Sequence, residues 1–275
     1  MIADDDTIDI LDIGAMAIGS GKETYAPLLE TGKTRILGFE PDEAECTKLN
    51  ADNDASRKYY PHFVGDGGKA TYYETNMTMT GSLFEPNTEL LSKFQNLNEL
   101  TTLVATHDVE TVRLDDVDGI ENVDYIKIDV QGAELSVFEN GTKTPAQSMI
   151  IHTEVEFVEM YKEQPLFANV DTFLRSQGYQ FHTFSNYGSR CFKPFKIDDN
   201  VNKGLNQRLW ADAVYVRDFM KFDDLPDNKL IKLAVILNDI YQSFDYCYYV
   251  LAHLDQKNDT SLAADYVARI NAATV

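Results

Sequence analysis

Short apolar runs alternate with amphipathic segments along most of the chain. The runs predict strands at residues 7–13, 35–39, 59–64, 123–128, 148–154, 179–184 and 213–217. The amphipathic segments predict helices at residues 23–30, 43–52 and 170–176. Strands separated by helices indicate βαβ units, which wind into a mostly parallel α/β sheet with helices on both faces. Residues 65–117 are less regular, and we expect short antiparallel strands and a loop that cover one edge of a ligand site.

The pattern changes after Pro226, where apolar residues recur at steps of three and four. This spacing predicts one stripe on a long helix. The stripe comprises Leu230, Leu233, Leu237, Ile240, Phe244, Cys247, Leu251 and Leu254. A second helix is expected at residues 262–271, capped by Thr260 or Ser261. The stripe either packs on the sheet as an extra layer or forms a homodimer through the C-terminal helices. Residues 1–220 are thus the expected sheet domain, and residues 221–275 are a helical extension.

Composition narrows the class of protein and its partners. The 275 residues are 44% hydrophobic, which is typical of a globular domain. Acidic residues outnumber basic ones 45 to 24, and the net charge of -21 disfavours nucleic acid and anionic membranes as partners. The three cysteines lack metal-site or disulfide spacing, which favours a reducing compartment. Without a signal segment or a bilayer-length apolar run, we expect a cytoplasmic protein.

A candidate cofactor pocket follows the first two expected strands. The first strand ends in Asp12-Ile-Gly14-Ala15, and the second ends in Glu40-Pro41. Glycine lets the backbone approach a ligand, and a terminal acid can accept hydrogen bonds from both ribose hydroxyls. A plain strand-turn-helix connection also contains glycines, but this order of elements is more specific. The expected cofactor-binding residues are Asp12, Gly14, Ala15, Gly19, Glu40, Pro41, Asp66 and Gly67.

The glycine pattern distinguishes between nucleoside cofactors. The turn lacks the middle glycine of Gly-x-Gly-x-x-Gly, which clears room for a pyrophosphate, and this disfavours a nicotinamide-dependent oxidoreductase. Asp12 before the turn suits a cofactor with a cationic amino group, such as S-adenosylmethionine. Asp66 follows the third strand, where it is placed either to contact the adenine amino group or to serve as a surface turn aspartate.

A second group of polar residues marks the expected acceptor side. Asp129 ends an apolar strand, at the carboxyl edge where open α/β sheets bind ligands. His152, Glu154 and Glu156 alternate along the next strand and therefore share one face. The expected catalytic residues are Asp129, His152 and Glu154, and the expected substrate-binding residues are Ser82, Glu134 and Glu156. A structural histidine at His152 and a helix cap at Glu134 are the alternatives.

Taken together, the motifs resemble the FkbM family of S-adenosylmethionine-dependent methyltransferases over roughly residues 7–218. In chain order they are Asp12-Ile-Gly14-Ala15, Gly38-Phe39-Glu40-Pro41, Gly81-Ser82-Leu83, Leu114-Asp115-Asp116, Ile126-Lys127-Ile128-Asp129-Val130-Gln131-Gly132-Ala133-Glu134 and Thr153-Glu154-Val155-Glu156-Phe157. The resemblance implies a class I methyltransferase sheet of seven strands with the last antiparallel. It also implies O-methylation of a small-molecule acceptor, a sugar or a specialised metabolite. One departure is that Met16 replaces the family's usual Asn in the first loop, and the next glycine, Gly19, comes one residue late.

Two alternatives remain open from the sequence. Asp129 and Glu154 offer hard oxygen ligands, so Mg²⁺ could assist the transfer as in catechol O-methyltransferase-like enzymes. Alternatively, the altered first loop could belong to a catalytically silent binding module that keeps the fold without binding the cofactor.

Overall fold

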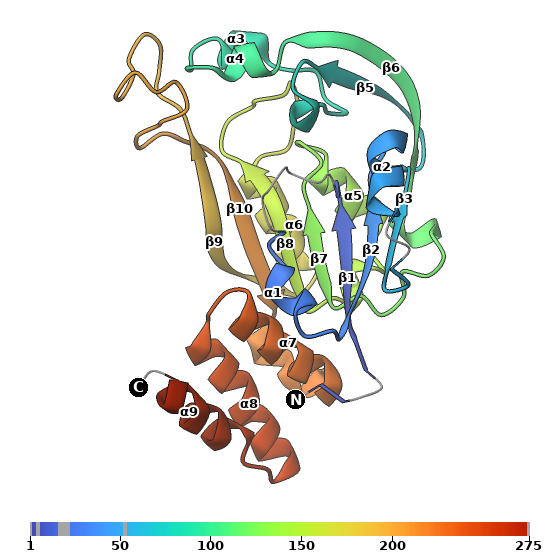
Figure 1. Cartoon of the computed structure of the whole chain (residues 1–275), viewed down its shortest axis with the longest axis vertical. Coiled ribbons are helices and arrows are strands. Elements are labelled where there is room, and N and C mark those ends of the chain that lie inside the picture. Colours follow the sequence, from blue (N-terminus) through green and yellow to red (C-terminus); the bar gives the residue numbers. More distant parts are fainter. Residues whose placement is uncertain (1, 4–5, 16–22, 52–53, 274–275) are drawn as a thin grey trace.

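The central element is a seven-stranded sheet. The computed structural model describes residues 2–3, 6–15, 23–51 and 54–273. The strand order is β3-β2-β1-β7-β8-β10-β9 (Figure 1). These strands are β1 (Ile8–Ile13), β2 (Thr34–Phe39), β3 (Arg57–Tyr60), β7 (Tyr125–Ile128), β8 (Ile150–Glu156), β9 (Tyr179–Ser189) and β10 (Arg208–Arg217). Strand β10 runs antiparallel to both neighbours, and the pairs among β3, β2, β1, β7 and β8 are parallel. The predicted mostly parallel sheet with an antiparallel last strand is confirmed.

Helices cover both faces of this sheet. The described helices are α1 (Ala26–Leu29), α2 (Glu43–Leu49), α3 (Thr88–Leu91), α4 (Leu97–Leu100), α5 (Glu134–Asn140), α6 (Phe167–Ser176), α7 (Asp227–Asp239), α8 (Phe244–Asn258) and α9 (Leu262–Ala273). Because strand side chains alternate, Ile8 and Ile10 of β1 join the core with α1, α7 and α8, whereas Leu11 and Ile13 join the core with α5 and α6. Two apolar cores on opposite faces explain why the strands appear in the sequence as continuous apolar runs.

A smaller sheet lies over the carboxyl ends of the main strands (Figure 1). It consists of β4 (Phe63–Val64), β5 (Lys69–Thr75) and β6 (Leu103–Val112) in the order β4-β6-β5. The antiparallel pair β5 and β6 confirms the expectation for residues 65–117. The single strand predicted at residues 59–64 is wrong, because β3 ends at Tyr60 and β4 belongs to the second sheet. Pro61 lies at the break, where its missing N–H cannot extend the ladder.

The C-terminal apolar stripe forms two helices, so the predicted single long helix is wrong. Helices α7 and α8 pack against each other, and Gln242 in their connection has a left-handed φ of 52°. Six stripe residues are at most 1% exposed and share the core with β1 and β7: Leu230, Leu233, Leu237, Cys247, Leu251 and Leu254. A continuous helix would carry half of this stripe away from the sheet, which is the physical reason for the break.

The buried stripe packs within the chain as an extra layer, which was one of the two interpretations of the C-terminal segment. A homodimer through the C-terminal helices stays a prediction, and it would use faces of these helices other than the buried stripe. Ser261 lies at the predicted cap position of α9, where its backbone carbonyl accepts a hydrogen bond from Asp265 N–H at 3.1 Å. Asp255 of α8 accepts hydrogen bonds from the backbone N–H groups of Leu262 and Ala263, at 2.7 and 2.9 Å.

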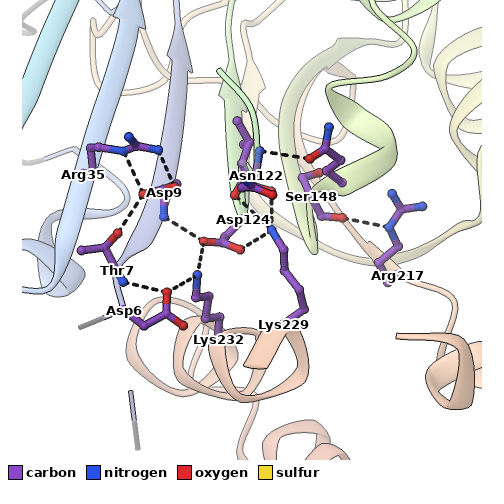
Figure 2. Close-up of polar contacts among 12 residues, drawn as sticks. Asp6, Thr7, Asp9, Arg35, Asn122, Asp124, Ser148, Arg217, Lys229 and Lys232 are labelled. Atoms are coloured by element: carbon purple, nitrogen blue, oxygen red, sulfur yellow. Dashed lines mark hydrogen bonds and ion pairs between the residues drawn. The ribbon is translucent and has the colours of Figure 1, made fainter. Parts of the chain in front are cut away.

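A buried polar network joins α7 to the amino end of the sheet (Figure 2). Asp124, fully buried just before β7, accepts hydrogen bonds from Lys229 Nζ at 2.6 Å and from Lys232 Nζ at 3.0 Å. It also accepts one from the backbone N–H of Asp9 at 2.9 Å. Lys232 also forms an ion pair with Asp6 at 2.9 Å. The network therefore binds α7, β1 and β7 together at the edge opposite the carboxyl ends.

Two further observations concern the cysteines and the length of the helices. Cys46, Cys191 and Cys247 are buried free thiols, in agreement with the expectation of no disulfide framework. Among the helices in the described ranges, none is long and apolar enough to cross a membrane.

Candidate active site

A cavity of about 670 Å³ lies at the carboxyl ends of the parallel strands. Gly14 and Glu40, which follow β1 and β2, line one end. Glu154 of β8, Arg190 after β9 and Trp210 of β10 line the other end. Residues 77–83 and β6 of the smaller sheet complete the wall. The location agrees with the general rule that ligands of open α/β sheets bind outside the carboxyl edge.

Gly14 forms the floor of the cavity between β1 and β7. It has a left-handed φ of 79°, and an added Cβ would lie 2.0 Å from the backbone oxygen of Asp129. Its carbonyl accepts a hydrogen bond from Lys127 Nζ at 3.0 Å. Only glycine fits this conformation and this close approach. The predicted cofactor turn therefore begins at a position where the backbone itself is exposed to the cavity.

Asp12 lies beneath this turn and is 1% exposed. Its carboxylate accepts a hydrogen bond from Tyr25 OH at 2.6 Å and lies 3.3 Å from Lys127 Nζ. Burial opposes the charge of Lys127, but Asp12, Asp129 and Glu23 raise the pKa of that lysine above its ordinary value. Asp12 is thus placed to hold Lys127 and the turn, whereas we expected it to contact the cofactor. Ala15 is also buried outside the cavity lining, and Gly19 lies outside the described residues.

Glu40 is 2% exposed and lines the cavity, as does Pro41. One of its oxygens, Oε1, accepts a hydrogen bond from the backbone N–H of Asp42 at 2.8 Å. Burial raises the pKa of Glu40 above its usual range. A buried carboxylate at the end of β2 is stabilised by further donors, which ribose hydroxyls would supply. Its placement is the one expected for a cofactor-binding acid.

The structure places Asp66 and Gly67 outside the cavity lining. Asp66 is exposed, and its Oδ1 accepts hydrogen bonds from Gly68 N–H at 2.8 Å and from Thr111 Oγ1 at 3.2 Å. This is the surface-turn alternative for Asp66. The cavity wall in this part of the chain is instead formed by residues 62–64. The turn after the split strand carries the chain away from the cavity, and sequence spacing alone did not indicate this.

Asp129 and Glu154 meet at the acceptor end through Gln131. The side-chain nitrogen of Gln131 donates to Asp129 Oδ1 at 2.7 Å and to Glu154 Oε2 at 2.8 Å. Its side-chain oxygen accepts a hydrogen bond from Tyr161 OH at 3.0 Å. All four residues line the cavity. Gln131 and Tyr161 were missed from the sequence, although Gln131 lies within the motif that identified Asp129.

The backbone around Gln131 has an unusual conformation. Gln131 has a φ of 55° and Gly132 a φ of 98°, so two successive left-handed residues turn the chain from β7 into α5. Ser82 Oγ, on the cavity wall, donates to the carbonyl of Gln131 at 2.6 Å. A non-glycine residue in the left-handed region costs free energy, and such residues concentrate at functional sites. The turn aims the Gln131 side chain at the two carboxylates.

Four carboxylates gather at this end of the sheet. Burial raises the pKa of Glu134 to about 7, with a contribution from the charge of Asp129. Burial and the neighbouring carboxylates also raise the pKa values of Glu154 and Glu156 well above the usual range. Of the three residues predicted to bind the substrate, Ser82 lines the cavity, whereas Glu134 and Glu156 are 2% exposed and do not. Glu134 Oε1 instead accepts a hydrogen bond from the backbone N–H of Val130 at 2.8 Å.

His152 lies deeper in β8 than the cavity. Its Nδ1 lies 3.0 Å from Tyr241 OH, and its Nε2 lies 3.4 Å from Ser185 Oγ. Tyr241 OH in turn donates to Tyr125 OH at 3.1 Å. The ring is 4% exposed and is not part of the cavity wall. The structure thus gives His152 the position of a hydrogen-bonded core histidine, which was the alternative to a catalytic base.

The carboxylate cluster at the ends of β7 and β8 tests the Mg²⁺ hypothesis. Asp129, Glu134 and Glu154 offer oxygens within 4.8 Å of one another, and carboxylate oxygens are the ligands that Mg²⁺ takes. However, the Gln131 nitrogen is a donor and bonds to both Asp129 and Glu154. The Gln131 amide therefore occupies the two carboxylates that Mg²⁺ would need as ligands. The residues as arranged do not fit Mg²⁺.

Comparisons with known proteins agree with this geometry. The FkbM methyltransferase domain matches residues 12–181. The 2-O-methyltransferase NoeI of Sinorhizobium fredii is 31% identical over 176 residues, which span 59% of this chain and 69% of that protein. Among solved structures, magnesium protoporphyrin IX methyltransferase of Synechocystis has a TM-score of 0.39 at 10% identity, over 78% of this chain and 71% of that one. A TehB-like methyltransferase of Corynebacterium glutamicum has a TM-score of 0.35 at 12% identity, over 78% and 82%.

The two solved structures are too distant to carry an argument, so the assignment depends on the sequence matches. The domain match covers more than half of the chain and includes Gly14, Glu40, Asp129 and Glu154. This chain belongs to the FkbM family and is an S-adenosylmethionine-dependent methyltransferase.

Proposed function

We propose that the protein transfers the methyl group of S-adenosylmethionine to a hydroxyl oxygen of a small molecule, a sugar or a specialised metabolite. The observation that carries this proposal is one continuous cavity from Gly14 and Glu40 to Asp129 and Glu154. A cofactor-type acid and a candidate base thus line the same cavity. The printed activity of NoeI, 2-O-methylation, supports oxygen as the acceptor atom. The net charge of -21 supports a small molecule rather than nucleic acid.

The cofactor half of the proposed reaction uses the first two strands. Glu40 would hold the adenosyl ribose through hydrogen bonds to its hydroxyls, and the exposed backbone at Gly14 would hold the methionine part. Lys127 and Asp12 hold that backbone from below. When bound, the cofactor would supply an electrophilic methyl group on a cationic sulfur, and the carboxylates of Asp129 and Glu154 in the same cavity would favour that charge.

The acceptor half uses Asp129 as general base. In the transfer, the carbon–sulfur bond of the cofactor breaks as the carbon–oxygen bond forms, and the hydroxyl proton passes to a carboxylate. Burial and the charge of Asp129 raise the pKa of Glu154 well above its usual range. Asp129 is half-buried and lines the cavity at the carboxyl end of β7, so it is the carboxylate placed to accept the hydroxyl proton. Gln131 positions both side chains. Mg²⁺ has no part in this reaction, so excess EDTA should leave the turnover unchanged.

Two measurements test the proposal. Calorimetric titration with S-adenosylmethionine, S-adenosylhomocysteine and NAD should give binding of the first two only. Glu40→Ala should weaken adenosylhomocysteine binding by about 1 to 3 kcal/mol, because charged hydrogen bonds to the ribose are lost. An unchanged dissociation constant would remove Glu40 from the cofactor site. If the wild-type protein binds none of the three ligands, the silent binding module becomes the better explanation.

Methyl transfer from labelled S-adenosylmethionine to a panel of sugars tests the acceptor side. Asp129→Asn should lower turnover by about 100-fold or more, the usual contribution of a general base, with adenosylhomocysteine binding kept. Asp118→Asn is the matched control, because Asp118 is exposed and does not line the cavity. Equal turnover of Asp129→Asn and wild type would assign Asp129 a structural role.

A further inference from the structure

Arg190 is a cation at the acceptor end of a strongly acidic protein. It follows β9 directly and lines the cavity together with Trp210, Tyr161 and Glu154. The acceptor end lies several strands along the sheet from Glu40, the proposed ribose-binding acid, because β1, β7 and β8 separate β2 from β10. Neighbouring strands are about 4.8 Å apart, so Arg190 is far outside the reach of the cofactor ribose.

The arginine is held in a defined position. Its guanidinium carbon lies 5.3 Å from the centre of the Trp210 ring. Trp210 itself lies against Gly188, where an added Cβ would come within 1.8 Å of the indole ring. The next residue along the chain, Cys191, accepts a hydrogen bond at its carbonyl from the backbone N–H of Gln95 at 2.9 Å. Strand β9, strand β10 and the segment after α3 thus fix Arg190 before any ligand binds.

The charge of Arg190 is not balanced by the protein. The other Lys or Arg side chain on the cavity wall within the described ranges has an acidic partner, since Lys127 Nζ lies 3.3 Å from Asp12. Within the described ranges, no ion pair reaches Arg190, and its Nε is buried without a hydrogen-bond partner. One donor, Nη1, bonds to the backbone carbonyl of Ser189 at 2.9 Å. Burial alone lowers its pKa.

An unpaired arginine in a cavity is a recognition group for an anion. The planar guanidinium matches carboxylate, sulfate and phosphate geometry, and its stacking on an aromatic ring leaves the outer N–H donors free. Arg190 is half-buried, and burying part of a charge with no counter-charge beside it has a cost in free energy. In a chain with 45 acidic and 24 basic residues, a carboxylate partner would be easy to supply, yet the described part of the chain supplies none here.

We propose that the methyl acceptor carries an anionic group, a carboxylate, sulfate or phosphate, which binds Arg190 while the reacting hydroxyl faces Asp129. The inference deepens the proposed methyl transfer and rests on it for the identity of the reacting group. The anion-binding part depends on Arg190 and Trp210 alone. Arg190 is here a specificity-determining residue, and it takes no part in the bond-making step.

The test compares sugars that differ in one group. Glucuronate, glucose 6-sulfate, glucose 6-phosphate and neutral glucose are titrated by calorimetry into the wild-type protein, with and without saturating S-adenosylhomocysteine. The variants are Arg190→Gln and, as a matched control, Arg208→Gln, whose exposed guanidinium lies 5.0 Å from the Tyr187 ring outside the cavity wall. At least one anionic sugar should bind the wild type more tightly than glucose does. Arg190→Gln should weaken that binding by about 10- to 100-fold, as expected for a charge-assisted hydrogen bond, and Arg208→Gln should not.

Each outcome has a definite meaning. The inference is overturned if glucose binds the wild type as tightly as every anionic sugar, or if Arg190→Gln binds the preferred anion unchanged. The titrations with the three anionic sugars identify whether Arg190 binds a carboxylate, a sulfate or a phosphate. Adenosylhomocysteine binding and transfer of labelled methyl are measured on the same samples. If these fail while anion binding follows Arg190, the proposed methyl transfer is refuted, and the anion site stands alone.

Discussion

Glu134→Gln should make the protein less sensitive to rising pH. The pKa of Glu134 is raised from 4.5 to about 7 by burial, with Asp129 nearby. A carboxyl whose pKa is higher in the folded state opposes folding as the pH rises, because the unfolded chain ionises first. About a quarter of this cost is present at pH 5, which is just above the unfolded pKa, and nearly all of it is present at pH 8. Since one pKa unit corresponds to about 1.4 kcal/mol, the loss of stability between these pH values is about 2 to 3 kcal/mol.

The glutamine removes this cost and preserves the local structure. Its side-chain oxygen can still accept the hydrogen bond that Val130 N–H donates to Glu134 Oε1 at 2.8 Å. The substitution also removes one of the negative charges that raise the pKa values of Glu154 and Glu156. The variant should therefore be more stable than wild type at pH 8 and close to it at pH 5.

Urea unfolding curves at several pH values between 5 and 8 measure the effect. The free energy of unfolding of wild type should fall by about 2 to 3 kcal/mol more than that of Glu134→Gln over this range. Glu139→Gln is the control, because Glu139 is exposed on the same helix, α5, and should follow wild type. Parallel curves for wild type and Glu134→Gln would refute the reasoning.

Three further perturbations follow from the geometry. Gly14→Ala should abolish adenosylhomocysteine binding in calorimetry and destabilise the fold, because its Cβ would lie 2.0 Å from a backbone oxygen; unchanged affinity would contradict the close approach. Asp124→Asn should lower the free energy of unfolding by about 3 kcal/mol, because it removes the carboxylate with which Lys229 and Lys232 both pair. A loss under 1 kcal/mol in urea titration would count against the network. His152→Gln should lower the melting temperature while turnover stays within a few-fold of wild type, whereas a turnover loss near that of Asp129→Asn would restore His152 as a catalytic residue.

The sequence predicted the parts of the fold that depend on local patterns. Apolar runs mark strands that are buried on both faces, so the positions of β1, β2, β7 and β8 along the chain were predictable. Glu40 and Asp129 were predictable because each follows such a strand at its carboxyl end. The break between α7 and α8 was not predictable, because the apolar spacing continues from Ile240 to Phe244 although the backbone turns at Gln242 between them.

The missed site residues depend on contacts between distant segments. The side chain of Gln131 is oriented by its left-handed backbone and by a hydrogen bond from Tyr161, which follows β8 in the chain. His152 was predicted as a base because its strand position is close to Glu154, but its partner Tyr241 lies in the connection after α7. Arg190 has no motif around it, and its position depends on Trp210 across the β9 and β10 pair. Such pairings are set by tertiary packing, which strand periodicity does not contain.

The acceptor wall of the cavity has its own apolar core. Leu91, Phe94, Leu97, Met160, Tyr161 and Leu209 form a cluster separate from the two cores of the sheet. The loop after β9 and the segment around α3 and α4 are linked, because Gln95 donates to Cys191 and Phe195, and Lys193 N–H donates to Lys93. The two segments therefore form one exchangeable unit. Replacing them together offers a route to new acceptors, and replacing either one alone would break the hydrogen bonds and the packing that hold the other.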